Sequence, residues 1–140
     1  MTVNQSITGH LLERKQQIMA LEAFAALAAP MISPELFQHK EIIWFVDNES
    51  AVSSLIRGAS RPHDVNHVAA LSTVLYSKLD AKVWFEWIDT ESNPADGLSR
   101  EGLEDPWTSA QPWDCTDLGS RDWSAAFEAD PTDPSSFSFY

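Results

Sequence analysis

Apolar residues recur at helical spacing over residues 11–29, and this pattern predicts the first helix. Proline lacks the backbone N–H that an interior helical residue donates, so Pro30 is expected to end the helix. The apolar positions that set the spacing are Ile18, Leu21, Phe24, Ala25 and Ala28.

Two short apolar runs, residues 41–47 and 82–88, are rich in β-branched and aromatic residues and predict strands. Runs without polar alternation are typical of strands buried on both faces of a parallel sheet. Trp84 and Trp87 fall on opposite faces of the second strand, and we expect them in the core or at an interface. Residues 2–8 are a weaker candidate for a third strand.

Three further helices separate and follow these strands. Gly58 is expected to end the first of them, and Asp64 is a suitable N-cap for the second. Strands that alternate with helices indicate an α/β layer with parallel strands. The three helices are predicted at 50–57, at about 65–79 and from Asn93–Pro94 onward.

Charge divides the chain into a domain of residues 1–100 and a tail of residues 101–140. The net charge is -12. The tail contributes -8 (nine acids, one base) and the domain -4 (twelve acids, eight bases). The tail is rich in Asp, Pro and Ser without a sustained period, so we expect it to be largely disordered. A partner-binding peptide and docking back onto the domain are the alternatives.

Bulk properties also limit the function classes. No run of about 18 apolar residues predicts a membrane span, and the N-terminus lacks a secretory signal pattern. Cys115 is the single cysteine, which excludes an internal disulfide and disfavours a cysteine zinc site. We therefore expect an intracellular protein, cytoplasmic or nuclear, without a membrane partner. The acidic balance counts against strong autonomous binding to nucleic acid.

Three carboxylates lie at the edges of apolar segments: Glu22 in the first helix, Asp47 at the end of the first strand and Asp96 after the second strand. A charge beside a buried run is costly unless something positive compensates it, so together they suggest a divalent metal site. Each also has a structural interpretation. Glu22 suits the solvent face of a helix, Asp47 can cap the following helix, and Asp96 favours a helix N-terminus.

Other polar candidates carry less information. His63 and His67 are four residues apart, a spacing that suits a metal, but no third ligand is evident nearby. Surface arginines are either phosphate contacts or ordinary solvated charges. These arginines are Arg57, Arg61 and Arg100.

Three segments in this order resemble the ribonuclease H domain of retroelement reverse transcriptases. They are Gln17-Ile-Met-Ala-Leu-Glu-Ala23, Trp44-Phe-Val-Asp-Asn-Glu-Ser-Ala51 and Ser92-Asn-Pro-Ala-Asp-Gly-Leu-Ser-Arg100. The resemblance covers about residues 15–100. It implies an α/β, partial RNase H-like fold, in which helices flank a mixed sheet, followed by the acidic tail.

The resemblance also implies a chemistry. Members of this family cleave the RNA strand of RNA–DNA hybrids with two Mg²⁺ ions about 4 Å apart, with Mn²⁺ as an alternative. It gives the roles of catalytic and metal-binding carboxylates to Glu22, Asp47 and Asp96. The positions implied for substrate binding are Asn48, Ser50, Asn93 and Arg100.

The chain also departs from the family pattern. The family's first strands, and the aspartate on the first of them, have no counterpart before Glu13, and the loop 89–92 lacks a histidine. We therefore expect a truncated domain with impaired cleavage, partnered by an RNA–DNA hybrid, a polymerase domain or a chain that supplies a strand. A non-catalytic remnant acting as an interaction module is the alternative, and an unrelated small α/β domain is the third hypothesis.

Overall fold

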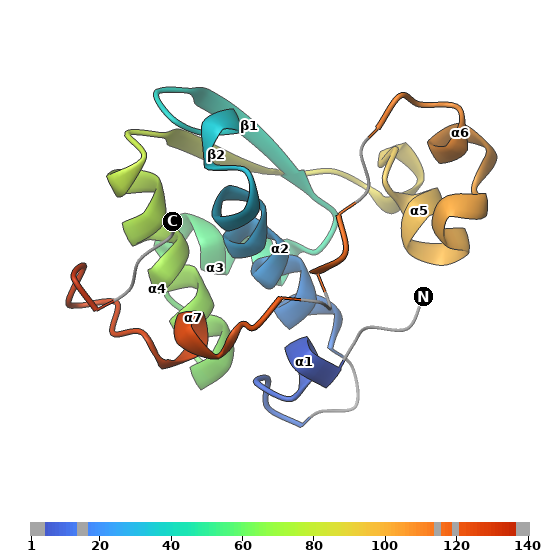
Figure 1. Cartoon of the computed structure of the whole chain (residues 1–140). Helices are drawn as coiled ribbons and strands as arrows, with labels where there is room; N and C mark the ends of the chain where they lie inside the picture. The colour runs from blue at the N-terminus through green and yellow to red at the C-terminus, as the bar shows by residue number, and fades with distance from the viewer. Residues whose placement is uncertain (1–4, 14–16, 114–115, 119–120, 137–140) are drawn as a thin grey trace.

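The computed structural model describes residues 5–13, 17–113, 116–118 and 121–136 (Figure 1). The helices are α1 Gln5–Thr8, α2 Ile18–Ile32, α3 Glu49–Arg57, α4 His63–Lys78, α5 Asp96–Glu101, α6 Pro106–Ser109 and α7 Ser124–Glu128. The strands are β1 Glu41–Val46 and β2 Lys82–Trp87, and 3₁₀ turns cover Pro34–Leu36, Thr90–Ser92 and Gly102–Glu104. Among these described residues, no helix is long and apolar enough to cross a membrane.

The two strands pair in parallel, from Glu41 opposite Lys82 to Val46 opposite Trp87. The α/β class with parallel strands is therefore confirmed, although the described sheet has two strands. Helices α2, α3 and α4 gather on one side of this sheet (Figure 1). The prediction that the strands are buried on both faces is wrong, because no described element covers the other face. Its side chains are exposed: Ile43 (65%), Phe45 (55%) and Trp84 (59%).

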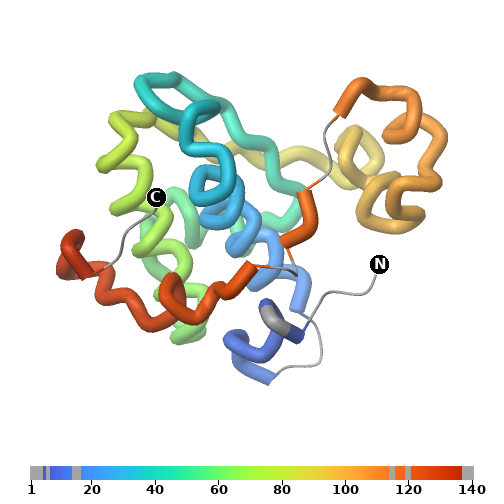
Figure 2. The backbone as a smooth tube through the Cα atoms, in the orientation of Figure 1, coloured from blue at the N-terminus to red at the C-terminus, as the bar shows by residue number. Residues whose placement is uncertain are grey.

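The core lies between α2 and α4, beneath the sheet (Figure 2). Alanines of α2, including Ala23 and Ala26, are fully buried and allow the two helices to approach closely. Leu71 and Leu75 of α4 fill the interface, and each is at most 1% exposed. Burial of such a leucine stabilises the fold by about 1.5–3 kcal/mol relative to an exposed position.

Helix α2 differs from its prediction at both ends. Residues 11–13 precede it without helical structure, and Pro30 lies inside the helix, which continues to Ile32. A proline at this position leaves the carbonyl of Ala26, four residues earlier, without its helical donor. The hydroxyl of Tyr76 on α4 donates to that carbonyl at 2.6 Å. A tertiary hydrogen bond therefore replaces the missing helical one.

The helices around the strands follow their predictions more closely. Asn48 caps α3, because its side-chain oxygen accepts from the Ala51 N–H at 2.9 Å, and Gly58 ends the helix with φ 65°. Helix α4 starts at His63, so Asp64 is not its N-cap. Asp64 is buried in the first turn and accepts from the Leu12 N–H at 3.0 Å.

The predicted N-terminal strand is wrong where it can be compared. Residues 5–8 form the short helix α1, and residues 2–4 of that strand lie outside the described part of the chain. A single helical turn satisfies its own backbone groups locally, as the Gly9 N–H does by donating to the Gln5 carbonyl at 2.9 Å. Among the described residues, no third strand therefore pairs with β1 or β2.

The prediction of a disordered tail is wrong for residues 121–129. They pack on the helical layer, by which we mean α2, α3 and α4. Trp123 is 1% exposed, and its ring meets the ring of Phe24 edge-on at 4.9 Å. Arg121 lies over the Trp123 ring at 5.0 Å and donates to the Met31 carbonyl at 3.3 Å. Ala126 and Ala129 are buried beside Trp123. Apolar residues every three positions therefore give this acidic segment one face that docks.

Residues 96–110 form a separate small unit, which we call the α5–α6 lobe. Helices α5 and α6 and the turn Gly102–Glu104 pack mainly on one another, and Figure 1 shows them apart from α2 and α4. The helix expected from Asn93–Pro94 begins at Asp96, since Asn93 first forms a turn by accepting from the Ala95 N–H at 3.0 Å.

Candidate functional site

Asp47, at the carboxyl end of β1, is near enough to Glu22 for its charge to act on that carboxyl group. Glu22 is half-buried on α2, and Asp47 directly follows β1. Burial raises the pKa of Glu22 above its ordinary value of 4.5, and the negative charge of Asp47 raises this pKa further. Two carboxylates that repel each other in a partly desolvated place are stabilised when a cation lies between them.

Asn93 connects this pair to the end of β2. Its side-chain N–H₂ donates to Asp47 at 3.2 Å. Parallel pairing explains the contact, because the two strands run in register and end at the same edge. The carbonyl of Asn93 in turn accepts from the N–H of Asp96 at 3.0 Å, which ties the start of α5 to the site.

Asp96 does not join the other two carboxylates. Its Oδ1 accepts from the Nε of Arg100, one helical turn later, at 3.1 Å. Within the described ranges, no three His, Cys, Asp or Glu side chains lie close enough together to hold a metal ion. Two of the three predicted carboxylates therefore interact electrostatically, and the third pairs with a cation of its own helix.

The donor set of the Glu22–Asp47 pair fits a hard cation. The two carboxylates offer oxygen ligands, which Mg²⁺ prefers. Asn93 turns its N–H₂ toward Asp47, and its side-chain oxygen accepts from the Ala95 N–H. Nitrogen and sulfur ligands, which zinc would favour, are not part of this group.

Asn48 and Ser50 occupy different positions at the start of α3. Asn48 uses its side-chain oxygen to cap the helix, so that oxygen is engaged within the chain. Ser50 is exposed and lines a hollow between α2 and α3. Met19 also lines the hollow, and it lies on α2 one helical turn before Glu22.

This hollow contains two of the arginines that the sequence suggested as phosphate contacts, and the predicted substrate-binding residue Ser50. Arg57 and Arg61, on opposite sides of Gly58, both line it together with four serines and the acidic Glu49. Arginine and hydroxyl groups are common phosphate ligands. The sequence signal was the density of serine and arginine between residues 50 and 61. The serines that line the hollow are Ser50, Ser53, Ser54 and Ser60.

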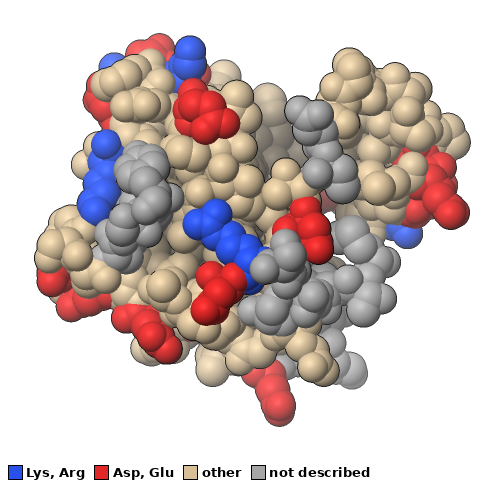
Figure 3. All heavy atoms as spheres, in the orientation of Figure 1, with Lys and Arg blue, Asp and Glu red and all other residues tan. Residues whose placement is uncertain are grey.

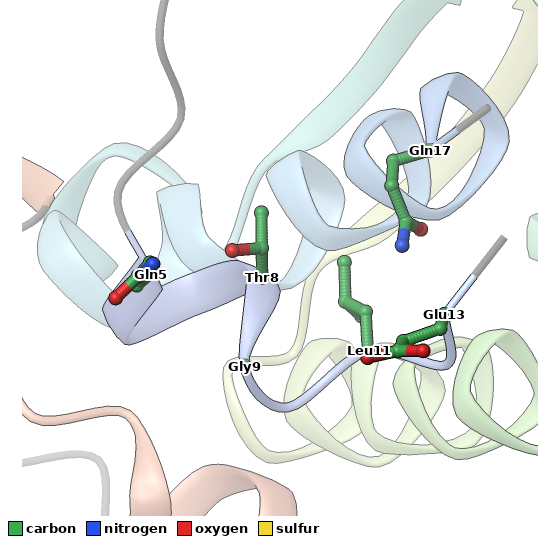
Figure 4. Close-up of a pocket in the computed structure, with 6 residues that line it drawn as sticks. All are labelled: Gln5, Thr8, Gly9, Leu11, Glu13 and Gln17. Atoms are coloured by element: carbon green, nitrogen blue, oxygen red, sulfur yellow. The ribbon is translucent and has the colours of Figure 1, made fainter. Parts of the chain in front are cut away.

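A second hollow lies near the N-terminus, between α1 and the start of α2 (Figure 4). Among its lining residues, Glu13 is the single ionisable one, so it offers no pair of carboxylates and no cation. Its lining residues are Gln5, Thr8, Gly9, Leu11, Glu13 and Gln17. It is therefore a weaker candidate for phosphate or metal chemistry.

The two histidines also separate in role. His63 is exposed at the start of α4, and the Nε2 of His67 lies 3.3 Å from the Ala126 carbonyl of α7. His67 thus contacts the docked part of the tail.

On the face drawn in Figure 3, acidic side chains are scattered over both the main body and the α5–α6 lobe.

Comparisons of the chain with models of protein families, with curated protein sequences and with solved structures found no match. The geometry of the site and the three sequence segments described above are therefore the basis for proposing a function.

Proposed function

We propose that the chain is an RNase H-like domain of a reverse transcriptase that cleaves the RNA strand of RNA–DNA hybrids, with activity reduced by a missing metal ligand. The observation that carries the proposal is the hydrogen bond from the Asn93 side-chain N–H₂ to Asp47 at 3.2 Å, which joins the carboxyl ends of the two parallel strands. The half-buried Glu22 supports it, because burial and, to a smaller extent, the charge of Asp47 raise its pKa.

The location supports a ligand site on general grounds. In open α/β sheets, ligands bind beyond the carboxyl ends of the strands, where Asp47 and Asn93 lie. Glu22 and Asp47 would hold Mg²⁺, and Asp96 would join them after releasing Arg100. When bound, the metal supplies activation of water and stabilisation of the leaving oxygen.

The remaining residues of the site would position the nucleic acid. Arg57, Arg61 and Ser50 would contact backbone phosphates in the hollow beside Met19. Asn93 would hold Asp47 in orientation through its hydrogen bond. Arg100, once separated from Asp96, would be free for a phosphate. A polymerase domain or a strand-supplying chain would complete the binding surface.

Cleavage of an end-labelled RNA–DNA hybrid in Mg²⁺ tests the proposal. We expect slow cleavage by the wild-type chain and none by Asp47→Asn or Glu22→Gln. Asp80→Asn is a matched control, because Asp80 is exposed at the amino end of β2, away from the carboxyl end of the strands. Equal traces of cleavage in all four proteins would identify contamination and contradict the proposal.

The second candidate is a non-catalytic interaction module. The ion pair between Asp96 and Arg100 favours it, because this pair keeps the third carboxylate away from the other two. Two results together would establish this candidate over the nuclease. The folded wild-type chain would cleave nothing in Mg²⁺ or Mn²⁺, and the carbon-detected NMR signal of the Glu22 carboxyl would not respond to Mg²⁺.

A further inference from the structure

The outer edge of β2 has a pattern that is complementary to itself. The N–H of Lys82 donates to the Lys40 carbonyl and that of Ile88 to the Val46 carbonyl, so even-numbered residues of β2 direct their backbone groups toward β1. The odd-numbered residues Val83 and Phe85 therefore direct theirs away from β1, where no described strand pairs with them. Such an unpaired edge is a template for another strand.

The side chains on the open face of β2 are arranged symmetrically around Trp84. Lys82 lies two residues before it and Glu86 two residues after it, and all three are exposed. Alternation along a strand places them on the same face. Trp84 is 59% exposed and contacts its own Glu86, because its ring N–H donates to that carboxylate at 3.1 Å.

We propose that the outer edge of β2 pairs in antiparallel fashion with β2 of a second copy of this chain, with Trp84 on the two-fold axis. In this register Lys82 of each copy lies opposite Glu86 of the other, so both charges meet an opposite charge. The dimer would join two short sheets into one of four strands.

The hydrogen-bonding parity agrees with this register. With Trp84 opposite Trp84, Val83 of each copy lies opposite Phe85 of the other, and both residues direct their N–H and C=O groups to this edge. They form hydrogen-bonded pairs, whereas the Trp84 pair is of the non-hydrogen-bonded kind. In that kind the side chains are closer, with Cα atoms about 4.5 Å apart. The two indoles therefore pack on each other over the open face.

The outer edge of β1 lacks this complementarity. Its open-face residues are Glu41, Ile43 and Phe45. A two-fold axis at Ile43 would place the carboxylate of Glu41 opposite the ring of Phe45, with no cation for either copy. The charge pattern therefore selects β2 as the edge for self-association, and a second copy as its occupant.

Sedimentation velocity over a wide range of protein concentration tests the dimer with charge-reversal variants. Lys82→Glu places two carboxylates opposite each other at both ends of the pairing, and Glu86→Lys places two ammonium groups there. Each is expected to raise the dimer dissociation constant at least about tenfold. The double variant Lys82→Glu/Glu86→Lys restores opposite charges and should return it to near the wild-type value.

Glu41→Lys is the matched control. Lys82 binds Glu41 within the chain at 3.2 Å, and both side chains are highly exposed. This variant removes the same intrachain pair as Lys82→Glu but leaves the outer edge of β2 unchanged, so the dimer should persist. A second readout is amide hydrogen exchange, which should slow at Val83 and Phe85 as concentration rises.

Three outcomes would overturn the proposal. One is a chain that stays monomeric at every concentration, as expected if a different protein or another segment of this chain covers the face. Another is a dimer that Lys82→Glu does not weaken, which would place the interface elsewhere. The third is a weakened dimer that the double variant fails to restore, which would exclude this register.

Discussion

The helical layer and the α5–α6 lobe are held together by different forces. In the layer and the segment docked on it, large apolar side chains are fully buried, among them Leu27, Leu75 and Trp123. In the lobe, Thr108 is the single buried residue among 96–110. Polar contacts dominate there instead, such as Asp105, which caps α6 by accepting from the Thr108 N–H at 2.7 Å.

This difference explains why Asp96 lies apart from Glu22 and Asp47 in the candidate site. Glu22 is carried by the packed helix α2, and Asp47 follows a strand whose last residue, Val46, is buried. Their meeting is therefore fixed by the core. Asp96 belongs to the lobe, where little apolar burial determines its place, and it binds the nearest cation, Arg100. The predictions that follow test this contrast, from the largest expected effect to the smallest.

Removal of a tail anchor should have the largest effect. Trp123→Ala leaves a cavity beside Phe24 and should lower the free energy of unfolding by about 3–5 kcal/mol. Trp113→Ala is the control, because Trp113 is 53% exposed and its ring meets that of Trp107 edge-on at 5.3 Å. Urea unfolding followed by circular dichroism measures both. Equal, small effects would show that residues 121–129 do not belong to the core.

The hydrogen bond from Tyr76 should have the next largest effect. Burial raises the pKa of Tyr76, so its hydroxyl keeps the proton that it donates to Ala26. Tyr76→Phe leaves the Ala26 carbonyl without a donor and should cost about 1–3 kcal/mol.

A second substitution sharpens this prediction. Pro30→Ala restores an N–H at position 30, which can donate to the Ala26 carbonyl in the ordinary helical way. In that background Tyr76→Phe should cost clearly less than it does in the wild-type chain. A cost that is the same in both backgrounds would contradict the assignment of the Tyr76 hydroxyl as a replacement for the helical donor.

The pKa of Glu22 tests the coupling of the carboxylate pair. Asp47→Asn should lower this pKa only part of the way to 4.5, because burial is the larger cause and the Asp47 charge the smaller. Carbon-detected NMR of the Glu22 carboxyl measures the change, and addition of Mg²⁺ to the wild-type chain should lower the same pKa. A Glu22 pKa that is unchanged by Asp47→Asn would show that the two groups do not interact.

The same shift predicts a pH dependence of stability. The unfolded chain releases the Glu22 proton near pH 4.5, whereas the folded chain retains it to a higher pH. The contribution of Glu22 to stability is therefore present below pH 4.5 and is lost as pH rises through the folded pKa. Glu22→Gln should remove this loss, so that the variant becomes relatively more stable toward neutral pH in urea titrations.

The ion pair in the lobe should contribute least. Arg100→Ala should change the free energy of unfolding by less than about 1 kcal/mol, because the Arg100 side chain is 68% exposed. The same variant releases Asp96 and should strengthen Mg²⁺ binding, measured through the Glu22 carboxyl signal. Weaker Mg²⁺ binding in Arg100→Ala would argue that Asp96 does not become a metal ligand when it separates from Arg100.

Local signals in the sequence determined much of this protein. Gly58 ends α3 as expected, and the two apolar runs form parallel strands, whereas Asn48 rather than Asp47 caps α3. These features follow from contacts between residues a few positions apart and from the periodicity of burial. The sequence also pointed to Glu22 and Asp47 as carboxylates at the edges of apolar segments, and the charge of Asp47 does act on Glu22.

Tertiary structure decided the rest. Pro30 remains helical because a tyrosine 46 positions later supplies a donor, and the acidic tail docks because Trp123 meets Phe24 about 100 positions earlier. The open face of the sheet and the pairing of Asp96 with Arg100 likewise depend on which distant elements pack nearby. Local propensity is weak beside the burial of large side chains and the satisfaction of buried polar groups, and both are set by residues far apart in the chain.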